Sequence, residues 1–227
     1  LKCESKVLCC QSWIQMCKII NTVMKGSFVI IIFCTAILLS CNKNAETKAK
    51  SCCSKEKSTE ILKELSGESV YNLSSTWTTQ KEENLKLDHF RDKIMITAMI
   101  FTHCESACPR IVADMQRIEY ALTEKERNKV SFLLISMDPQ RDTPSRLTEF
   151  AEDHKLNANW TLICSTPDAT MEIANVLGVK VKKLESGGFD HSNIIHVFDR
   201  EGIVVNQQIG FAVEQKETLK AIRKLIK

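Results

Sequence analysis

Two cysteines four residues apart, Cys104 and Cys108, lie where an apolar segment of the chain gives way to an amphipathic one. Residues 94–101 are apolar except for one threonine, which predicts a strand buried on both faces. Apolar side chains then recur at helical spacing, at Ile111, Met115, Ile118 and Leu122. The sequence therefore predicts that a buried strand delivers two thiols to the start of a helix.

Two thiols in this position are suited both to metal binding and to redox chemistry. At a helix start, side chains four residues apart share one face, with β-carbons about 5–6 Å apart, so that both sulfurs can reach one small ion. A disulfide would draw the β-carbons to about 3.5–4.5 Å and tighten the turn. The free N–H groups and the positive end of the helix dipole favour the thiolate, which is both a metal ligand and a nucleophile. A structural disulfide or two inert core thiols are the alternative.

A metal held by two thiolates needs a further ligand, and His191 is the best candidate. It lies in residues 187–192, a glycine-containing segment that predicts a flexible loop just before a β-hairpin. His196 lies inside an apolar strand, an odd number of residues away, so we expect it to face another way and to belong to the core. Spacing alone leaves His191 open between a metal ligand and a solvated loop histidine.

The softness of these donors indicates which metal they would hold. Two thiolates and one imidazole suit Cu(I), which accepts low coordination numbers, whereas structural zinc sites have four protein ligands. Cu(II) would need water or a further group to complete a tetragonal set. Copper is therefore the predicted metal.

The elements that must position these residues alternate along the chain. Strands that alternate with helices predict the α/β class, and their order resembles the thioredoxin-like fold, with a central mixed sheet flanked by helices and an N-terminal β-hairpin extension. The expected strands are residues 70–73, 76–80, 94–101, 130–137 and 160–164, the expected helices are 109–122, 143–155 and 167–177, and a hairpin of 194–198 and 203–205 precedes a terminal helix at 214–226.

Charge and composition exclude one large class of function. The hydrophobic fraction is 44% and the charged fraction 26%, which is typical of soluble globular proteins. The net charge of +3 comes from residues 1–40, which hold four lysines and one glutamate, so that the rest of the chain carries 27 positive and 27 negative residues. Without a basic surplus on the predicted domain, a nucleic-acid partner has no electrostatic support.

The first 41 residues are typical of a targeting segment. Lys25 precedes an uncharged run at 28–39, which is short for a bilayer span of about 20 residues but suits a secretory signal. The residues that end at Cys41, Leu-Leu-Ser-Cys, resemble the lipobox of bacterial lipoproteins. We expect Cys41 to be lipidated and to hold the protein on the membrane of a bacterial cell envelope, outside the cytoplasm, on the periplasmic face. An uncleaved membrane anchor is the alternative.

Residues 42–68 form a polar segment without periodicity, which predicts a solvated tether. Two adjacent cysteines, Cys52 and Cys53, lie inside it. We expect no dedicated role for them in so polar a tether. Receipt of copper or disulfide exchange is the alternative.

Three separated motifs, in order, resemble the Sco/SenC family of copper-binding thioredoxin-like proteins. They are Phe-Thr-His-Cys and Cys-Pro at 101–109, Ser-Met-Asp-Pro-Gln-Arg-Asp-Thr-Pro at 136–144, and Asp-His-Ser at 190–192. The resemblance covers residues 69–227, which we take as the copper-binding domain. It implies that Cys104, Cys108 and His191 bind copper. It also implies delivery of that copper to the CuA site of cytochrome c oxidase or another cuproprotein, or reduction of thiols that prepares the CuA site.

The chain departs from the family pattern beside the first cysteine. Family members commonly have proline there, and this chain has Glu105, whose carboxylate we expect to disfavour the thiolate slightly and to bear on redox tuning and on the choice of partner. His103 is expected to be solvated, with an auxiliary ligand role as the alternative. Asp190 either orients His191 or serves a turn. Cys164 lies in an apolar strand and is expected in the core.

Other positions are expected to be structural. Asp142 or Thr143 is predicted to cap the following helix, and Pro144 suits its first turn. Trp160 and Phe189 are predicted to contribute packing alone.

Three functions remain open from the sequence. The leading hypothesis is a membrane-tethered copper chaperone. Its rival is a thiol-disulfide oxidoreductase in which Cys104 attacks a disulfide and Cys108 resolves the mixed disulfide, a reaction that does not require His191. A thiol peroxidase is the weaker third hypothesis.

Overall fold

The fold comes from a computed structural model, which describes residues 65–185 and 187–227. The predicted targeting segment at 1–41, most of the tether, and Cys41, Cys52 and Cys53 lie outside these residues. Among the described residues, no helix has both the length and the apolar character needed to cross a membrane.

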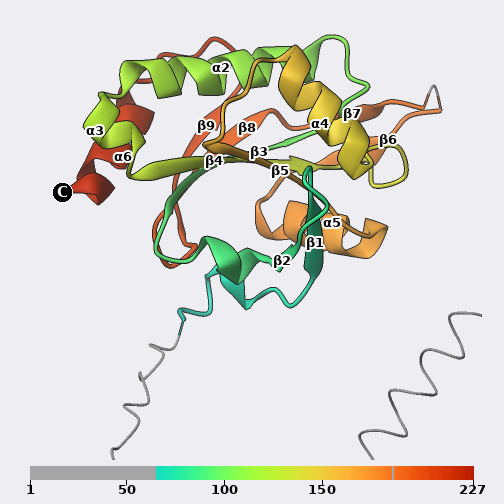
Figure 1. The fold of residues 1–227 in the computed structure, drawn as a ribbon, viewed down its shortest axis with the longest axis horizontal. Coiled ribbons are helices and arrows are strands. Elements are labelled where there is room, and N and C mark those ends of the chain that lie inside the picture. The colour runs from blue at the N-terminus through green and yellow to red at the C-terminus, as the bar shows by residue number, and fades with distance from the viewer. Residues whose placement is uncertain (1–64, 186) are drawn as a thin grey trace, which may run out of the picture. The chain divides into compact units, whose positions relative to one another are not determined.

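A seven-stranded mixed sheet forms the centre of the described domain (Figure 1). Its strand order is β2-β1-β5-β4-β3-β8-β9, in which β3, β4 and β5 are parallel and the remaining pairs are antiparallel. Two further strands, β6 and β7, pair only with each other. The strands are β1 Thr76–Thr79, β2 Asn84–Lys86, β3 Ile94–Ile100, β4 Val130–Ser136, β5 Trp160–Cys164, β6 Val181–Lys183, β7 Phe189–His191, β8 Ile194–Phe198 and β9 Val204–Ile209.

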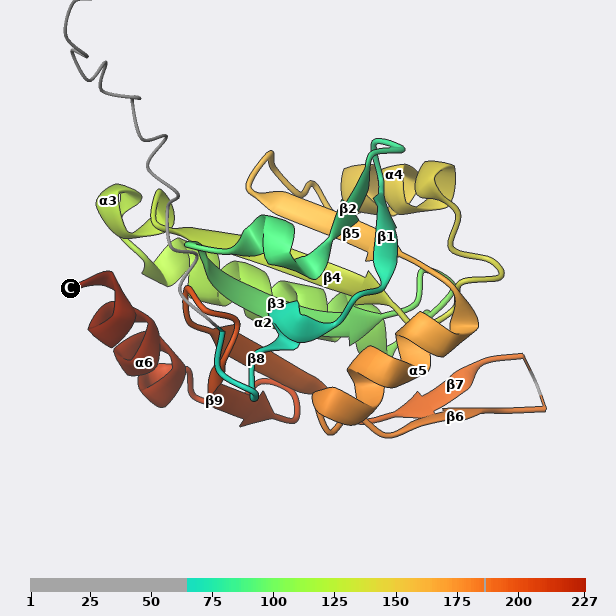
Figure 2. The ribbon, with the colours of Figure 1, turned by 90° about the horizontal axis from the view of Figure 1, so that it is seen from below.

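Helices cover both faces of the sheet. Figure 1 shows α2 and α4 on one face and α5 on the other, and Figure 2 shows the β6–β7 hairpin extending past the end of the sheet that lies farthest from the C-terminus. The predicted central mixed sheet flanked by helices is therefore confirmed. The helices are α2 Ala107–Ala121, α3 Glu124–Arg127, α4 Pro144–Asp153, α5 Pro167–Val176 and α6 Lys216–Ile226, with short 3-10 helices η1 Val70–Asn72 and η2 Leu87–Phe90.

The core is built around β3 and its parallel neighbour β4. Every side chain of β3 is buried, as its continuous apolar run predicts. On the adjacent strands, Phe132 stacks on Trp160 with ring centroids 4.5 Å apart, and the buried carboxylate of Glu119 on α2 accepts a 2.9 Å hydrogen bond from the Trp160 indole. These contacts hold α2 against the sheet. Strand β3 ends at Ile100, and the first cysteine motif follows directly.

The N-terminal part of the domain differs from the prediction, which expected strands at 70–73 and 76–80 alone before residue 94. Residues 70–73 were expected to form a strand, but they form η1, because the Ser69 side chain caps the turn by accepting a hydrogen bond from the Tyr71 N–H. The N-terminal β-hairpin is present, but β1 and β2 form it, and the strand β2 was not predicted. It is part of the main sheet, since β1 also pairs with β5.

Candidate metal centre

The two cysteines lie at the junction between β3 and α2. Helix α2 begins at Ala107, two residues earlier than predicted, so that Cys108 is in its first turn and Cys104 precedes it. The sulfur of Cys104 accepts a 3.3 Å hydrogen bond from the N–H of Cys108 and so caps this turn, in which Ser106 makes no side-chain cap. The predicted shared helical face is therefore replaced by a capping contact, and the two residues are still direct neighbours.

The two thiols differ in ionisation. Partial burial raises the pKa of Cys104, but hydrogen bonds from the N–H groups of Cys108, Ser106 and Ala107 and from the Cys108 side chain outweigh burial and lower its pKa overall. Burial raises the pKa of Cys108, whose sulfur accepts a hydrogen bond from the Phe101 N–H at 3.3 Å. Glu105 was expected to disfavour the thiolate slightly, but the pKa of Cys104 is lowered overall. Cys104 is thus the more exposed thiol, with the lower pKa, and Cys108 is the buried thiol, with the higher pKa.

A buried carboxylate holds this junction in place. Asp142 accepts hydrogen bonds from the Thr102 hydroxyl and the Ser136 hydroxyl, both at 2.6 Å, and from the Thr102 N–H at 3.2 Å. It therefore ties the end of β3 to the end of β4. Of the two predicted helix caps, Thr143 has that role, since its side chain accepts from the Arg146 N–H.

His103 lies beside this carboxylate without joining the cysteines in a ligand set. Its Nδ1 is 3.1 Å from the Thr102 hydroxyl and 3.7 Å from Asp142, and its side chain is 42% exposed. His103, Asp138 and Asp142 place three ligand atoms within 4.8 Å of one another. Asp138 is already paired with Arg141, and both Asp142 oxygens are hydrogen-bonded, so this cluster has a structural explanation.

His191 is the last residue of β7, so the loop predicted for 187–192 is wrong for Phe189–His191, while residues 187, 188 and 192 lie outside the strands. It pairs with Val181 of β6, and because it is not on the same strand as His196, the odd spacing of the two histidines has no bearing on their directions. His191 Nδ1 lies 3.2 Å from the Ser192 carbonyl oxygen, a partner that fixes the proton on Nδ1. The Asp190 side chain is exposed and Ser192 takes the orienting role.

The other ring nitrogen of His191 has no protein partner. Nε2 is buried and lacks a hydrogen bond among the described residues. Burial lowers the pKa of His191, while the Ser192 carbonyl and Asp190 oppose that change. A neutral imidazole with a free lone pair on Nε2 is the form that binds a metal.

Pairing of β3 with β8 brings His191 to the cysteines. The strands are antiparallel, with Ala98 opposite Ile195, so the start of β8 lies beside the end of β3. The Phe101 ring packs edge-on against His191 at a centroid distance of 6.0 Å and against Phe189 at 5.2 Å. One backbone segment therefore contacts both parts of the site.

Cys104 and His191 line one open cavity of about 360 Å³. Cys108 is fully buried and adjoins this site through its contacts with Cys104. The two sulfurs and the unpartnered Nε2 are donor types that a thiophilic cation binds. Among the described residues, these three atoms do not form a group within 4.8 Å of one another, so a bound ion would need them to move closer. The lining residues are Phe101, His103, Cys104, Glu105, Ser106, Ala107, Leu184, Gly188, Phe189, Asp190, His191 and Asn193.

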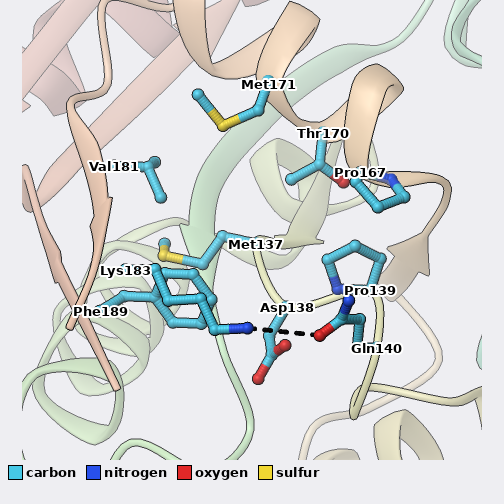
Figure 3. Close-up of a pocket in the computed structure, with 10 residues that line it drawn as sticks. All are labelled: Met137, Asp138, Pro139, Gln140, Pro167, Thr170, Met171, Val181, Lys183 and Phe189. Carbon is cyan, nitrogen blue, oxygen red and sulfur yellow. Dashed lines mark hydrogen bonds between the residues drawn. The ribbon is translucent and has the colours of Figure 1, made fainter. Parts of the chain in front are cut away.

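A second cavity, of about 260 Å³, is mostly apolar (Figure 3). Phe189 lines both cavities, so its position at the site is more specific than the packing role predicted for it. At the rim of the second cavity, Lys183 donates a 3.3 Å hydrogen bond to Gln140. This cavity contains thioethers, from Met137 and Met171, but no thiol or imidazole, so the candidate metal ligands belong to the first.

The remaining candidates lie in the core, as predicted. His196 is fully buried, with Nε2 at 3.0 Å from the Leu177 carbonyl oxygen. Cys164 is buried at the end of β5, its sulfur 3.7 Å from the Thr78 carbonyl oxygen, and burial raises its pKa. Asn193 was not predicted to have a role, because its place in the cavity depends on how β7 meets β8.

The chain is similar to known proteins over the described domain. The family described as SCO1/SenC matches residues 66–227. The chain is similar to the SCO1 protein homolog of Bacillus subtilis, with 29% identity over 139 residues, which are 60% of this chain and 72% of that protein.

Two solved structures show the same fold. The SCO1/SenC family lipoprotein of Bacillus anthracis has 21% identity and a TM-score of 0.62, and the match covers 67% of this chain and 92% of that one. ScoI of Bradyrhizobium japonicum, solved with copper bound, has 21% identity and a TM-score of 0.58, and the match covers 66% of this chain and 96% of that one.

Proposed function

The chain belongs to the SCO1/SenC family, a family of cytochrome c oxidase assembly proteins, and we propose that it is a copper chaperone whose cargo is held by Cys104, Cys108 and His191. Its partner in this proposal is the CuA-bearing subunit of cytochrome c oxidase or another cuproprotein. The observation that supports the proposal best is that Cys104, whose thiol has a lowered pKa, and His191, whose Nε2 is unpartnered, line the same cavity. The copper bound in ScoI supports the choice of metal.

The burial of the three ligands suggests how copper would leave. Cys104 is partly exposed, while Cys108 is fully buried. An incoming thiolate from a partner would therefore reach the copper from the Cys104 side. It would replace Cys104 first, and the buried Cys108 would be the last sulfur to release the ion.

An anaerobic Cu(I) titration in competition with a chelator tests the ligand set. We expect Cys104→Ser, Cys108→Ser and His191→Ala each to weaken Cu(I) binding by the full chain, and each sulfur to matter more than the imidazole. Cys164→Ser is the matched control, because Cys164 is also a buried free thiol but lies outside the cavity. A site-specific Cu(I) affinity that survives all three changes would overturn the proposal.

A thiol-disulfide oxidoreductase is the second candidate, supported by the unequal pKa values of the two thiols. The Cys104 thiolate would attack a client disulfide, form a mixed disulfide and release one client thiolate. Cys108 would then lose its proton and attack the Cys104 sulfur, which releases the second client thiolate. The client gains two electrons and the protein ends as the Cys104–Cys108 disulfide.

His191→Ala separates the two candidates. A reductase keeps its rate with a model disulfide in this variant, whereas a chaperone loses copper affinity. A peroxide-consumption assay on the reduced chain tests the third hypothesis, a thiol peroxidase.

We also propose that lipidated Cys41 anchors the protein in a bacterial envelope, with the domain outside the cytoplasm. The lipobox-like sequence and the family lipoprotein of Bacillus anthracis support this location. Mass spectrometry of the mature protein tests it, because an intact peptide before Cys41 would exclude the lipoprotein.

A further inference from the structure

Asn193 is a polar residue of the cavity that the proposed ligand set does not use. It follows His191 by two residues and directly precedes β8. Its carbonyl oxygen accepts a 2.9 Å hydrogen bond from the Gly210 N–H, which fixes its backbone against the end of β9. Its side chain lines the same cavity as Cys104 and His191.

The side-chain oxygen of Asn193 has an unmet bonding requirement. Oδ1 is buried and has no hydrogen-bond partner within the described part of the chain, as is also true of His191 Nε2. A buried acceptor without a partner costs about 1–3 kcal/mol, and two such atoms in one cavity double that cost. Both atoms offer lone pairs, so neither can satisfy the other. A hydrogen-bond donor or a cation satisfies such atoms, and the thiols beside this cavity favour a metal cation.

The carboxylates in the cavity do not share this property. Asp190 and Glu105 are exposed, so water satisfies their oxygens. Asp190 also lies on the opposite face of β7 from His191, since side chains alternate along a strand. Asn193 is therefore the oxygen donor that the fold itself holds in the cavity.

We infer that Asn193 supplies an oxygen ligand that completes the site for Cu(II). This inference rests on the proposed function, because it adds a fourth donor to Cys104, Cys108 and His191. Cu(II) prefers a tetragonal set with nitrogen and oxygen donors, whereas Cu(I) is satisfied by few, soft ligands. An amide oxygen therefore stabilises the oxidised ion selectively and lowers the Cu(II)/Cu(I) potential of the bound metal.

The test is to measure both oxidation states of copper on the full chain with Asn193→Leu. Leucine has a similar size and no lone pair. We expect Cu(II) affinity to fall at least about tenfold, the Cu(II) spin-resonance spectrum to change, and Cu(I) affinity to stay within about twofold. A tenfold loss confined to Cu(II) raises the one-electron potential by about 59 mV.

Two further variants control for shape and for the loss of a buried amide. Asn193→Asp retains an oxygen and adds charge, so Cu(II) should bind at least as tightly as in the wild type. Asn206→Leu removes another buried, unpartnered amide oxygen that lies on β9 and does not line the cavity, so it should leave both affinities unchanged.

The outcomes distinguish this inference from the proposed function. Unchanged Cu(II) affinity and spectrum in Asn193→Leu, beside normal Cu(I) binding, would overturn the role of Asn193 alone. A wild-type chain that binds neither state at this site would overturn the proposed function and the inference with it. Normal Cu(I) affinity also shows that the variant is folded.

Discussion

The two halves of the candidate site are anchored very differently. The β3–α2 junction, with both cysteines, continues a strand that is buried throughout and paired on both sides. The β6–β7 hairpin, with His191, is joined by three residue pairs and is not part of the main sheet. Side-chain contacts fix it to the body: Phe189 and His191 against Phe101, the Lys183–Gln140 hydrogen bond, and a 2.6 Å hydrogen bond from Arg141 to the Gly187 carbonyl oxygen.

Under the proposed function, this difference indicates which half would give way when metal enters or leaves. A segment with few buried contacts opens locally at a lower free energy than the core does. We expect the hairpin to open while the thiol half stays folded. His191 would then leave the metal without disturbing Cys108.

The largest effect is expected at the rigid half, from Asp142→Asn. The Asp142 carboxylate accepts hydrogen bonds from the Thr102 and Ser136 hydroxyls, and an amide would place its NH₂ group against one of these donors. A hydrogen bond to a charged group contributes about 1.5–3 kcal/mol. We expect the free energy of unfolding to fall by about 3 kcal/mol, measured by urea denaturation.

Asp190→Asn on the hairpin is the matched control for Asp142→Asn. Its carboxylate is exposed, so this variant should change the free energy of unfolding by less than about 0.5 kcal/mol. Equal losses of unfolding free energy in Asp142→Asn and Asp190→Asn would show that the two halves of the site are anchored equally firmly.

The second prediction concerns the ring that joins the hairpin to the junction. Phe189→Leu keeps an apolar side chain but loses an edge-on aromatic pair with Phe101, a contribution of about 0.5–1.5 kcal/mol. Hydrogen exchange of the hairpin amides should accelerate, while the exchange of β3 and β4 amides should change little. Acceleration throughout the sheet would mean that the hairpin unfolds together with the core.

The third prediction concerns the other anchor, Arg141. Its guanidinium is bonded to the Gly187 carbonyl and paired with Asp138. Arg141→Met should lower the free energy of unfolding by about 1 kcal/mol or less, because the side chain is largely exposed. Exchange of the hairpin amides should accelerate here too, but less than in Phe189→Leu. Arg146→Met, which removes an arginine that bonds Thr102 at the junction, should leave hairpin exchange unchanged.

The same contrast explains what the sequence could predict. A strand buried on both faces leaves a continuous apolar run, so residues 94–101 and the thiols after them were located correctly. The hairpin strands have three residues each, with Lys182, Lys183 and Asp190 exposed and two glycines nearby, a pattern that resembles a loop. Such short strands are recognised by the strand with which they pair, and the order of residues along the chain does not show that pairing.

The roles of Asp142 and Asn193 could not be predicted from the sequence, for a related reason. A residue before a predicted helix is most simply interpreted as a cap, but the partners of Asp142 are Thr102 and Ser136 on two other segments. Likewise, the unmet bond of Asn193 exists only after β7, β8 and the cysteine junction enclose its oxygen. Both roles depend on tertiary contacts. Cys104, Cys108 and His191 could be named from the sequence because a resemblance to a family implied them, and their role as copper ligands stays a prediction.

The smallest effect is expected within the rigid half, between its two thiols. Because the pKa of Cys104 is lowered and that of Cys108 raised, the Cys104 thiolate forms first as pH rises. Alkylation of the metal-free chain by iodoacetamide, followed by peptide mass spectrometry, should therefore label Cys104 at a lower pH than a free cysteine and Cys108 only at much higher pH. Glu105→Gln should shift the Cys104 profile only slightly, since Glu105 is exposed and water screens its charge. Earlier labelling of Cys108 would reverse the order of attack and release that both proposed functions require.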